Sequence, residues 1–239
     1  EPLLLTQEQM EKEDYPSSGS KQKAIDHEGL LRLRGSKRLI HPKDISQEDA
    51  EVVVQACSVP DETAIHQDNS SLVVGGSTEP SPRRVFALDC EMVQTSAGTE
   101  LGRVTLVELQ SFSSLDTLST HLLFDAIVRP KNTVVNYLTE YSGLTAVMLN
   151  DVKNTKSLEQ VQAALLVAVR PNDIVIGHSL ENDLWATRWI HETVIDTAVL
   201  LQQSERSFKH SLRHLSAVLL KKHIQRADNP HCSEEDAVT

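Results

Sequence analysis

VFALDCEMV, at residues 85–93, is the most informative segment of this 239-residue chain. Its dense apolar residues predict a buried β-strand, and residues two apart on a strand point to the same face. Asp89 and Glu91 therefore lie side by side among apolar neighbours. Two such carboxylates repel each other and resist burial, and a divalent cation that prefers oxygen ligands, Mg²⁺ or Mn²⁺, would relieve both effects. Taken alone, the pattern is more often an ordinary acidic pair on a solvent-facing edge strand.

The segments that follow predict an α/β fold. Residues 103–109 (RVTLVEL) alternate and predict a second strand, joined to the first by a hairpin that contains Gly98 and Gly102. The later predicted elements are a strand at 121–128, a helix at 157–170, a strand at 174–176, a helix at 179–190, a strand at 194–195, a helix at 211–224 and a helix that begins near Ser233. This order of strands and helices predicts a mixed sheet with helices on both faces.

The first third of the chain has a different composition. Eight of the nine aromatic residues lie at or after position 86, and aromatic side chains carry much of the buried area of a core. Residues 75–82 (GGSTEPSP) have the composition of a linker. We therefore predict that residues 1–82 are an acidic N-terminal arm and linker, largely disordered, and that residues 83–239 are one folded domain. Within the arm, weak helical patterns occur at 6–13 and 44–56.

The charge balance narrows the possible partners. The formal net charge is −11, which argues against a broad basic surface that coats nucleic acid but leaves room for a local basic groove. Residues 1–82 hold eight basic and fifteen acidic side chains, a net −7, and residues 83–239 carry the remaining −4. No apolar run approaches the roughly 18 residues of a membrane span, so no membrane association is expected. Three scattered cysteines fit a reducing intracellular compartment.

Two later segments carry further candidate site residues. Asp183 follows the predicted strand at 174–176, at the position where α/β sheets gather functional groups. His231 lies in a loop, and Asp236 lies in the first turn of the last predicted helix. A neutral histidine can accept a proton from a metal-bound water. Each residue alone has a plainer explanation, because both acids suit the positive end of a helix dipole and the histidine is one of ten.

Together, these segments resemble the DEDDh family of 3′→5′ exonucleases, named for four acids and a histidine. Asp89 and Glu91 match the first motif, Asp183 matches the second, and His231 and Asp236 match the third. Within the family the chain is most similar to the eukaryotic Rex-type RNA exonucleases. The similarity covers residues 85–237, and residues 1–16 more loosely, through the stretches FALDCEM, GHSLENDL, VIDTAVL, FKHSLRHL and HCSEEDA.

The resemblance implies an RNase H-like fold and a two-metal mechanism. Asp89, Glu91, Asp183 and Asp236 would hold two Mg²⁺ or Mn²⁺ ions, with His231 as the general base toward the attacking water. The implied substrate is the 3′ end of single-stranded RNA, which would lose nucleoside 5′-monophosphates. The implied setting is the 3′ processing or turnover of stable RNAs in the nucleus. The four ligands account for the net −4 of the predicted domain, which two dications would cancel.

A basic stretch near the third motif is a candidate nucleic-acid surface. Residues 206–226 hold six Lys and Arg and no Asp or Glu, a composition that suits phosphates. A solvated amphipathic helix explains the same pattern equally well. Lys209 and Arg213 are the candidate phosphate ligands in this stretch. Met92, beside Glu91, is a candidate contact to a terminal base, with a place in the core as the alternative.

The last predicted helix is truncated. Only three residues follow Asp236, whereas this helix continues for several turns in the family. A helix so short is unstable by itself, and Asp236 is therefore expected to be poorly anchored. Two other functions stay open at this point. One is a DNA-directed exonuclease of the same fold, because the five site residues do not discriminate between sugars. The other is a non-catalytic RNA-binding or interaction module, inactivated by the missing part of the helix.

Overall fold

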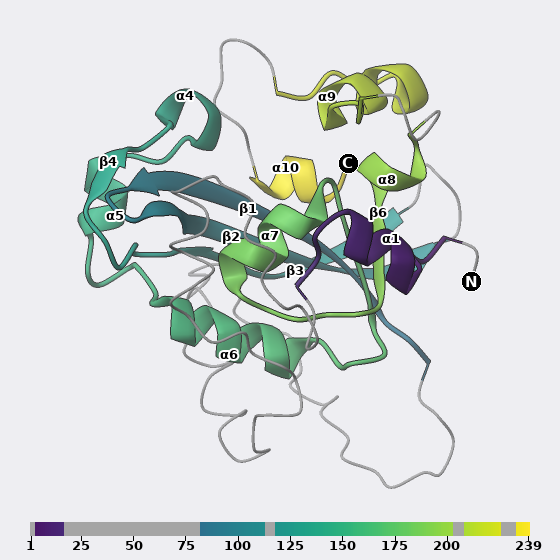
Figure 1. The fold of residues 1–239 in the computed structure, drawn as a ribbon, viewed down its shortest axis with the longest axis horizontal. Helices are drawn as coiled ribbons and strands as arrows, with labels where there is room; N and C mark the ends of the chain where they lie inside the picture. The colour runs from purple at the N-terminus through teal and green to yellow at the C-terminus, as the bar shows by residue number, and fades with distance from the viewer. Residues whose placement is uncertain (1–2, 17–81, 113–117, 203–207, 226–232) are drawn as a thin grey trace, which may run out of the picture.

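The computed structural model describes residues 3–16, 82–112, 118–202, 208–225 and 233–239. The predicted helix at 44–56 and the candidate base His231 lie outside these ranges. Within them the chain forms a six-stranded mixed sheet with helices around it, as the sequence predicts (Figure 1). No helix in the described ranges is long and apolar enough to cross a membrane.

The sheet is built around β1 (Val85–Thr95). A tight hairpin joins β1 to the antiparallel β2 (Gly98–Phe112), and β3 (Leu118–Ile127) continues the antiparallel arrangement. On the other side of β1, β5 (Ile174–Gly177) runs parallel to it and reaches only as far as Ala87. The strand order is β3-β2-β1-β5-β6, with the third parallel strand β6 (Val194–Asp196) at the edge and the short β4 (Val134–Asn136) paired to the end of β1.

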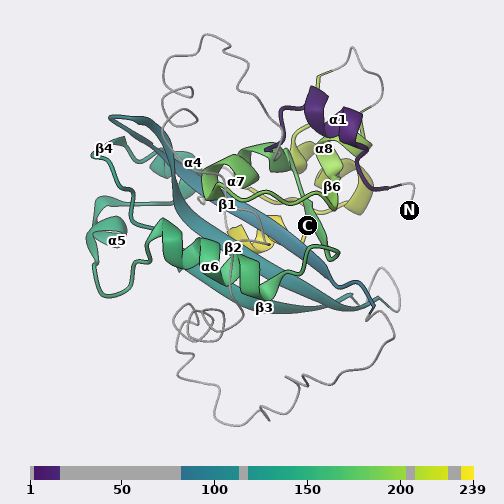
Figure 2. The same ribbon diagram turned by 60° about the horizontal axis from the view of Figure 1, so that its bottom comes forward.

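Helices cover both faces of this sheet, and Figure 2 shows α6 and α10 on opposite sides of it. Apolar residues of α6 and α7 pack against Leu88 and Cys90 of β1 in the main hydrophobic core. Asp89 and Glu91 alternate with these core residues and so face the other way, where α10 contacts β1 and β2. The helices are α1 (Gln7–Lys12), α4 (Thr139–Ser142), α5 (Ala146–Asn150), α6 (Leu158–Ala168), α7 (Leu180–Thr187), α8 (Thr197–Leu200), α9 (Leu212–Leu215), the π-helical η2 (Ser216–Leu220) and α10 (Ser233–Ala237).

Two of the predicted helices differ from the sequence-based expectation. The helix predicted at 211–224 is one α-helical turn, α9, continued by η2, and it ends at Lys221, whose φ of 58° is left-handed. The prediction that Ser179 caps α7 is wrong, because Ser179 has a φ of 56° and makes no side-chain cap. Instead the Asp196 carboxylate accepts hydrogen bonds from the backbone N–H groups of Ser179 and Leu180, at 2.9 and 3.0 Å. The cap therefore comes from the end of β6 and not from the sequence next to the helix.

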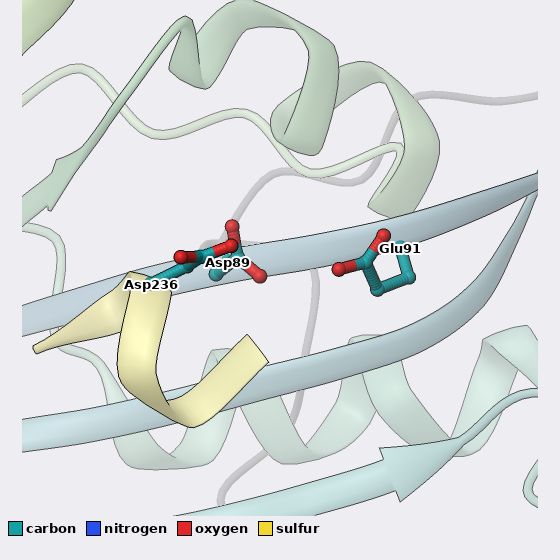
Figure 3. A group of neighbouring side chains, drawn as sticks. All are labelled: Asp89, Glu91 and Asp236. Atoms are coloured by element: carbon teal, nitrogen blue, oxygen red, sulfur yellow. The ribbon is translucent and has the colours of Figure 1, made fainter. Parts of the chain in front are cut away.

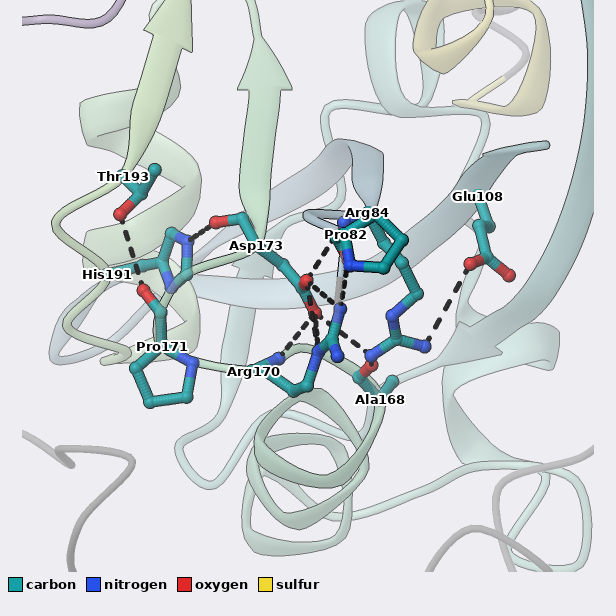
Figure 4. Close-up of polar contacts among 9 residues, drawn as sticks. All are labelled: Pro82, Arg84, Glu108, Ala168, Arg170, Pro171, Asp173, His191 and Thr193. Atoms are coloured by element: carbon teal, nitrogen blue, oxygen red, sulfur yellow. Dashed lines mark hydrogen bonds and ion pairs between the residues drawn. The ribbon is translucent and has the colours of Figure 1, made fainter. Parts of the chain in front are cut away.

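A network of ion pairs fixes the start of β1 (Figure 4). The fully buried carboxylate of Asp173 accepts hydrogen bonds from the backbone N–H of Arg84 at 3.0 Å and from its guanidinium at 2.9 Å. Arg170 pairs with the same carboxylate at 2.8 Å and also donates to the Pro82 carbonyl. The buried ring of His191 donates from Nε2 to the Asp173 carbonyl at 2.8 Å. These bonds tie the entry to β1 to the turn between α6 and β5.

Residues 3–16, here called the N-terminal segment, pack against the domain beside β6 and α7. Leu5, Met10 and Tyr15 join the main hydrophobic core, and the backbone N–H of Leu5 donates to the Val194 carbonyl of β6 at 3.0 Å. A capping box between Thr6 and the third residue of α1 begins the helix. The expectation of a largely disordered arm therefore does not hold for these residues, and residues 17–81 lie outside the described part of the chain.

Candidate active site

Three carboxylates converge beside the middle of β1 (Figure 3). Asp89 and Glu91 extend from β1, and Asp236 reaches them from α10. One carboxylate oxygen of each residue lies within 4.8 Å of one oxygen of each of the other two. Glu91 and Asp236 are buried, and Asp89 is half-buried. The structure thus gathers three of the four acids that the sequence offers as metal ligands, although they come from opposite ends of the domain.

These carboxylates are held where negative charge is unfavourable. Burial raises the pKa of Asp89 to about 6, and the charge of Asp236 adds to the shift, while a hydrogen bond from Ser233 opposes it. Burial also raises the pKa of Glu91 to about 8, together with the charges of Asp89 and Asp236. Arg103, opposite Glu91 on β2, lowers both pKa values. The repulsion among the acids therefore exceeds the compensation that this arginine supplies.

The compensating arginine is itself shared with another carboxylate. Arg103 donates from Nε and from one terminal nitrogen to Asp125 on β3, at 2.7 and 2.5 Å. A bidentate pair of this kind fixes the plane of the guanidinium. Arg103 therefore lies beside the acidic cluster in a fixed position, with much of its charge directed to Asp125.

Asp183 approaches the same site from α7. Burial raises the pKa of this carboxyl well above its usual range, and the charge of Asp89 raises it further. The neighbouring thiol and backbone N–H of Cys90 oppose this rise in the Asp183 pKa. The edge of β1 is accessible there because β5 stops pairing at Ala87. Asp183 thus lies next to the three-carboxylate cluster and completes the set of four predicted acids.

Two polar residues that sequence analysis did not assign to the site hold its carboxylates in place. The buried Ser233 donates a hydrogen bond to Asp89, and the side-chain amide of Gln225 donates to Asp236 at 2.9 Å. The expectation that Asp236 is poorly anchored is therefore wrong, because α10 packs on β1 and β2 and Gln225 fixes the carboxylate. One signal could have found Ser233. It lies three residues before Asp236, and that spacing places both on one face of a helix.

The donor set fits a divalent metal ion. Every ligand atom is a carboxylate oxygen, which is the donor that Mg²⁺ and Mn²⁺ prefer. The acids are grouped, buried and shifted toward their protonated forms. A dication would replace their mutual repulsion with attraction and so favour their ionised forms.

The residues predicted to contact RNA lie in three different surroundings. Met92 is partly buried and packs against the main core. The Lys209 ammonium pairs with Glu13 at 2.8 Å and with Glu181 at 3.2 Å, which holds it against the domain. Arg213 is exposed on α9. RNA contacts by these residues stay predictions, as does the role of the histidine in the third motif.

A mixed sheet that carries a cluster of acids on its central strand is the architecture of RNase H-like nucleases. The exonuclease family RNase_T matches residues 86–239 of this chain. The chain therefore belongs to this exonuclease family, a family of hydrolases whose domains use divalent metal ions.

Individual relatives agree with this assignment. The chain is 42% identical to the human protein named "RNA exonuclease 1 homolog" over 165 residues, which are 69% of this chain and 12% of that protein. The solved catalytic unit of Neurospora crassa Pan2 is 29% identical with a TM-score of 0.57, over 72% of this chain and 29% of that one. The Saccharomyces cerevisiae Pan2 module in complex with A7 RNA is 27% identical with a TM-score of 0.54, over 67% of this chain and 27% of that one. The chain thus spans a small part of each relative.

Proposed function

We propose that this chain is the catalytic part of a 3′→5′ exoribonuclease that releases nucleoside 5′-monophosphates from single-stranded RNA. The proposal rests on one observation above all, the cluster formed by Asp89, Glu91 and Asp236 with Asp183 beside it. Four carboxylates are enough to hold two divalent cations, Mg²⁺ or Mn²⁺, in the arrangement of two-metal nucleases.

The reaction is a hydrolysis. The water oxygen forms a bond to the terminal phosphorus and loses a proton, while the bond from that phosphorus to the preceding 3′ oxygen breaks and this oxygen takes up a proton from solvent to become a 3′ hydroxyl. Bound dications supply Lewis-acid stabilisation of the negative charge that develops. His231 would accept the proton from the attacking water.

The protein's own contribution is to preorganise the acidic ligands. Ser233 and Gln225 each restrain one carboxylate before any ligand binds, and such restraint lowers the entropy that the reactive complex must lose. The raised pKa values of Asp89 and Glu91 mean that protons leave these groups when a cation binds. Cation binding is therefore expected to be tighter at alkaline pH.

The choice of RNA as substrate is supported by the relatives and by one surface of the domain. The human relative is named an RNA exonuclease, and the yeast Pan2 module was solved with RNA bound. Arg213, Lys221 and Lys222 are exposed on α9 and just after η2, where their charges suit phosphates. Phe208 precedes them and is 95% exposed, which leaves its ring open to stack on a base.

A degradation assay tests the proposal. The full chain is incubated with matched single-stranded RNA and DNA, each labelled at the 5′ end, in Mg²⁺, Mn²⁺ or EDTA. We expect a ladder of RNA products shortened from the 3′ end, release of nucleoside 5′-monophosphates, and no cleavage in EDTA. Internal cuts, or cleavage that persists in EDTA, would contradict the mechanism. Preferential degradation of DNA would favour the DNA-directed alternative, and RNA binding without turnover in either metal would favour the non-catalytic one.

The histidine of the third motif has its own test. His231→Ala is expected to lower turnover by roughly 10²–10⁴-fold, the usual range for a general base, while binding of Mn²⁺ stays unchanged. Retention of full turnover would remove His231 from the mechanism. A nuclear location and a part in the 3′ processing or turnover of stable RNAs extend the proposal on the strength of the Rex-type resemblance. Microscopy of the tagged protein and sequencing of RNA 3′ ends after depletion would test both.

A further inference from the structure

The N-terminal segment contacts the domain close to the helix that carries Asp183. Tyr15 and Leu5 are buried within the main core, although residues 17–81 separate the segment from the domain along the chain. Leu5 adds a backbone hydrogen bond to β6, the strand at the edge of the sheet. Such contacts fix the position of the segment against β6 and α7, and three polar connections then link it to α7.

The first connection runs through a buried carboxylate. The Tyr15 hydroxyl donates to Asp196 at 2.6 Å. Asp196 is fully buried and also accepts from the backbone N–H groups of Ser179, Leu180 and Ala198, at 2.9, 3.0 and 2.8 Å. Burial and the charge of Asp196 raise the pKa of the Tyr15 phenol, so its proton stays in place as the donor. Tyr15 therefore completes the set of hydrogen bonds to the carboxylate that caps α7.

Two further connections reach the body of α7. The indole N–H of Trp185 donates to the Asp14 carbonyl at 2.6 Å. The Lys209 ammonium bridges Glu13 of the segment and Glu181 of α7, at 2.8 and 3.2 Å. All three connections thus act on one helix, at its N-terminus and on either side of Asp183 in the sequence.

We propose that the N-terminal segment is a positioning element of the active site, which holds α7 so that Asp183 lies beside Asp89 for metal binding. The inference rests on the proposed metal site and adds a role for residues that the family match, which begins at residue 86, does not include. α7 begins with a left-handed residue and has only two turns, so local sequence alone holds it weakly. Its position depends on Asp196, and the position of Asp196 depends in part on Tyr15.

Binding of Mn²⁺ to the full chain, followed by electron paramagnetic resonance without any RNA, tests this inference. Tyr15→Phe removes the hydroxyl and keeps the ring, and Tyr137→Phe is the matched control on a half-buried tyrosine outside these contacts. Groups that orient metal ligands typically change metal affinity by about 10–100-fold. Because Tyr15 acts through Asp196 and α7, we expect a weakening of about 3–10-fold, with the control unchanged.

A second pair of variants keeps the test valid if Tyr15→Phe does not fold. Glu13→Gln removes the ion pair to Lys209, and Glu11→Gln changes an exposed acid in the neighbouring last turn of α1. We expect about a 2–3-fold weaker binding of Mn²⁺ for Glu13→Gln, which corresponds to a partly exposed ion pair, and no change for Glu11→Gln.

Two outcomes separate the inference from the proposed function. Thermal unfolding is recorded for every variant, and binding is measured well below the midpoint of unfolding. A lower midpoint with unchanged Mn²⁺ affinity in both Tyr15→Phe and Glu13→Gln would show that the segment only stabilises the fold, and would overturn the inference. Asp183→Asn provides the reference. If it also leaves Mn²⁺ binding unchanged, the proposed metal site itself is wrong.

Discussion

Asp173, in the turn before β5, and the pair formed by Asp89 and Glu91 on β1 are carboxylates largely withdrawn from solvent, yet their surroundings are opposite. Burial alone would raise the pKa of Asp173, but hydrogen bonds from Arg170 and Arg84 bring it below its usual value (Figure 4). Asp89 and Glu91 lie among other acids, and their pKa values rise to about 6 and about 8.

The difference shows how a structural carboxylate and a functional one can be told apart within one domain. The cations that balance Asp173 are permanent parts of the protein, so the network is complete as folded. At the acidic cluster the compensating arginine is shared with Asp125, and more positive charge has to come from outside. A buried charge that lacks compensation costs stability, so the cluster indicates a site for a removable cation.

The largest expected effect is on the rate of RNA hydrolysis, and it tests whether the acids around Asp89 and Glu91 are functional. Asp183→Asn keeps the shape of the side chain and removes a metal ligand, so the rate of RNA hydrolysis should fall by roughly 10³-fold or more. The free energy of unfolding should stay the same or rise, because a buried carboxylate with a raised pKa disappears. Turnover measured in parallel with urea unfolding checks both points. Near-normal turnover would show that Asp183 is not a ligand.

Asp173→Ala tests the structural role of the other carboxylate in the comparison. This change leaves two arginines and two backbone N–H groups without their buried acceptor. We expect the free energy of unfolding to fall by about 2–3 kcal/mol, less than for a fully enclosed pair because both arginines are partly exposed. Glu192→Ala, at an exposed acid between α7 and β6, is the control and should leave unfolding unchanged. Equal stability of the two variants would refute the structural role of the Asp173 network.

The comparison also predicts a dependence on pH. Glu91 loses its proton near 4.5 in the unfolded chain and near 8 in the folded one, so between these values the folded state binds more protons. The free energy of unfolding of the metal-free protein should therefore fall as pH rises from about 5 to about 8, by on the order of 1–3 kcal/mol. Glu91→Gln should flatten this slope, and Mn²⁺ should restore stability at pH 8. Urea unfolding in EDTA across this range provides the measurement. A wild-type slope that Glu91→Gln leaves intact would assign it to other groups.

The smallest expected effect is on the affinity for Mn²⁺, and it tests whether Ser233 orients a carboxylate of the acidic cluster. Ser233→Ala removes the hydrogen bond to Asp89 and leaves every carboxylate in place. We expect Mn²⁺ to bind about 3–10-fold more weakly, below the range of about 10–100-fold that is typical for groups that orient metal ligands, because every carboxylate stays in place. Ser216→Ala removes a hydroxyl in η2 that donates to the Lys222 carbonyl, and it should leave Mn²⁺ binding unchanged. Equal affinities for both variants would show that Ser233 does not orient Asp89.

Much of the fold could be predicted because it follows local periodicity. The alternation of β1 and β2, the apolar run of β5 and the helical spacing of α6 are all properties of neighbouring residues. One of the predictions that were wrong concerns a contact across the chain, and another concerns where a helix ends. Ser179 was expected to cap α7, and that role belongs to Asp196, seventeen residues later. A helix was expected throughout 211–224, and the chain leaves it at Lys221 with a left-handed turn.

By itself, the sequence predicted the α/β fold class, because alternation and helical spacing operate over a few residues, and it predicted the acids of the site through motifs that resemble those of a known family. The tertiary structure decided which groups hold those acids in position. Ser233 reaches Asp89 across 144 residues, and Tyr15 reaches Asp196 across 181. No periodicity predicts contacts over such distances, since they depend on how the whole sheet and its helices pack. For the same reason only the folded molecule shows that the segment around Tyr15 belongs to the domain.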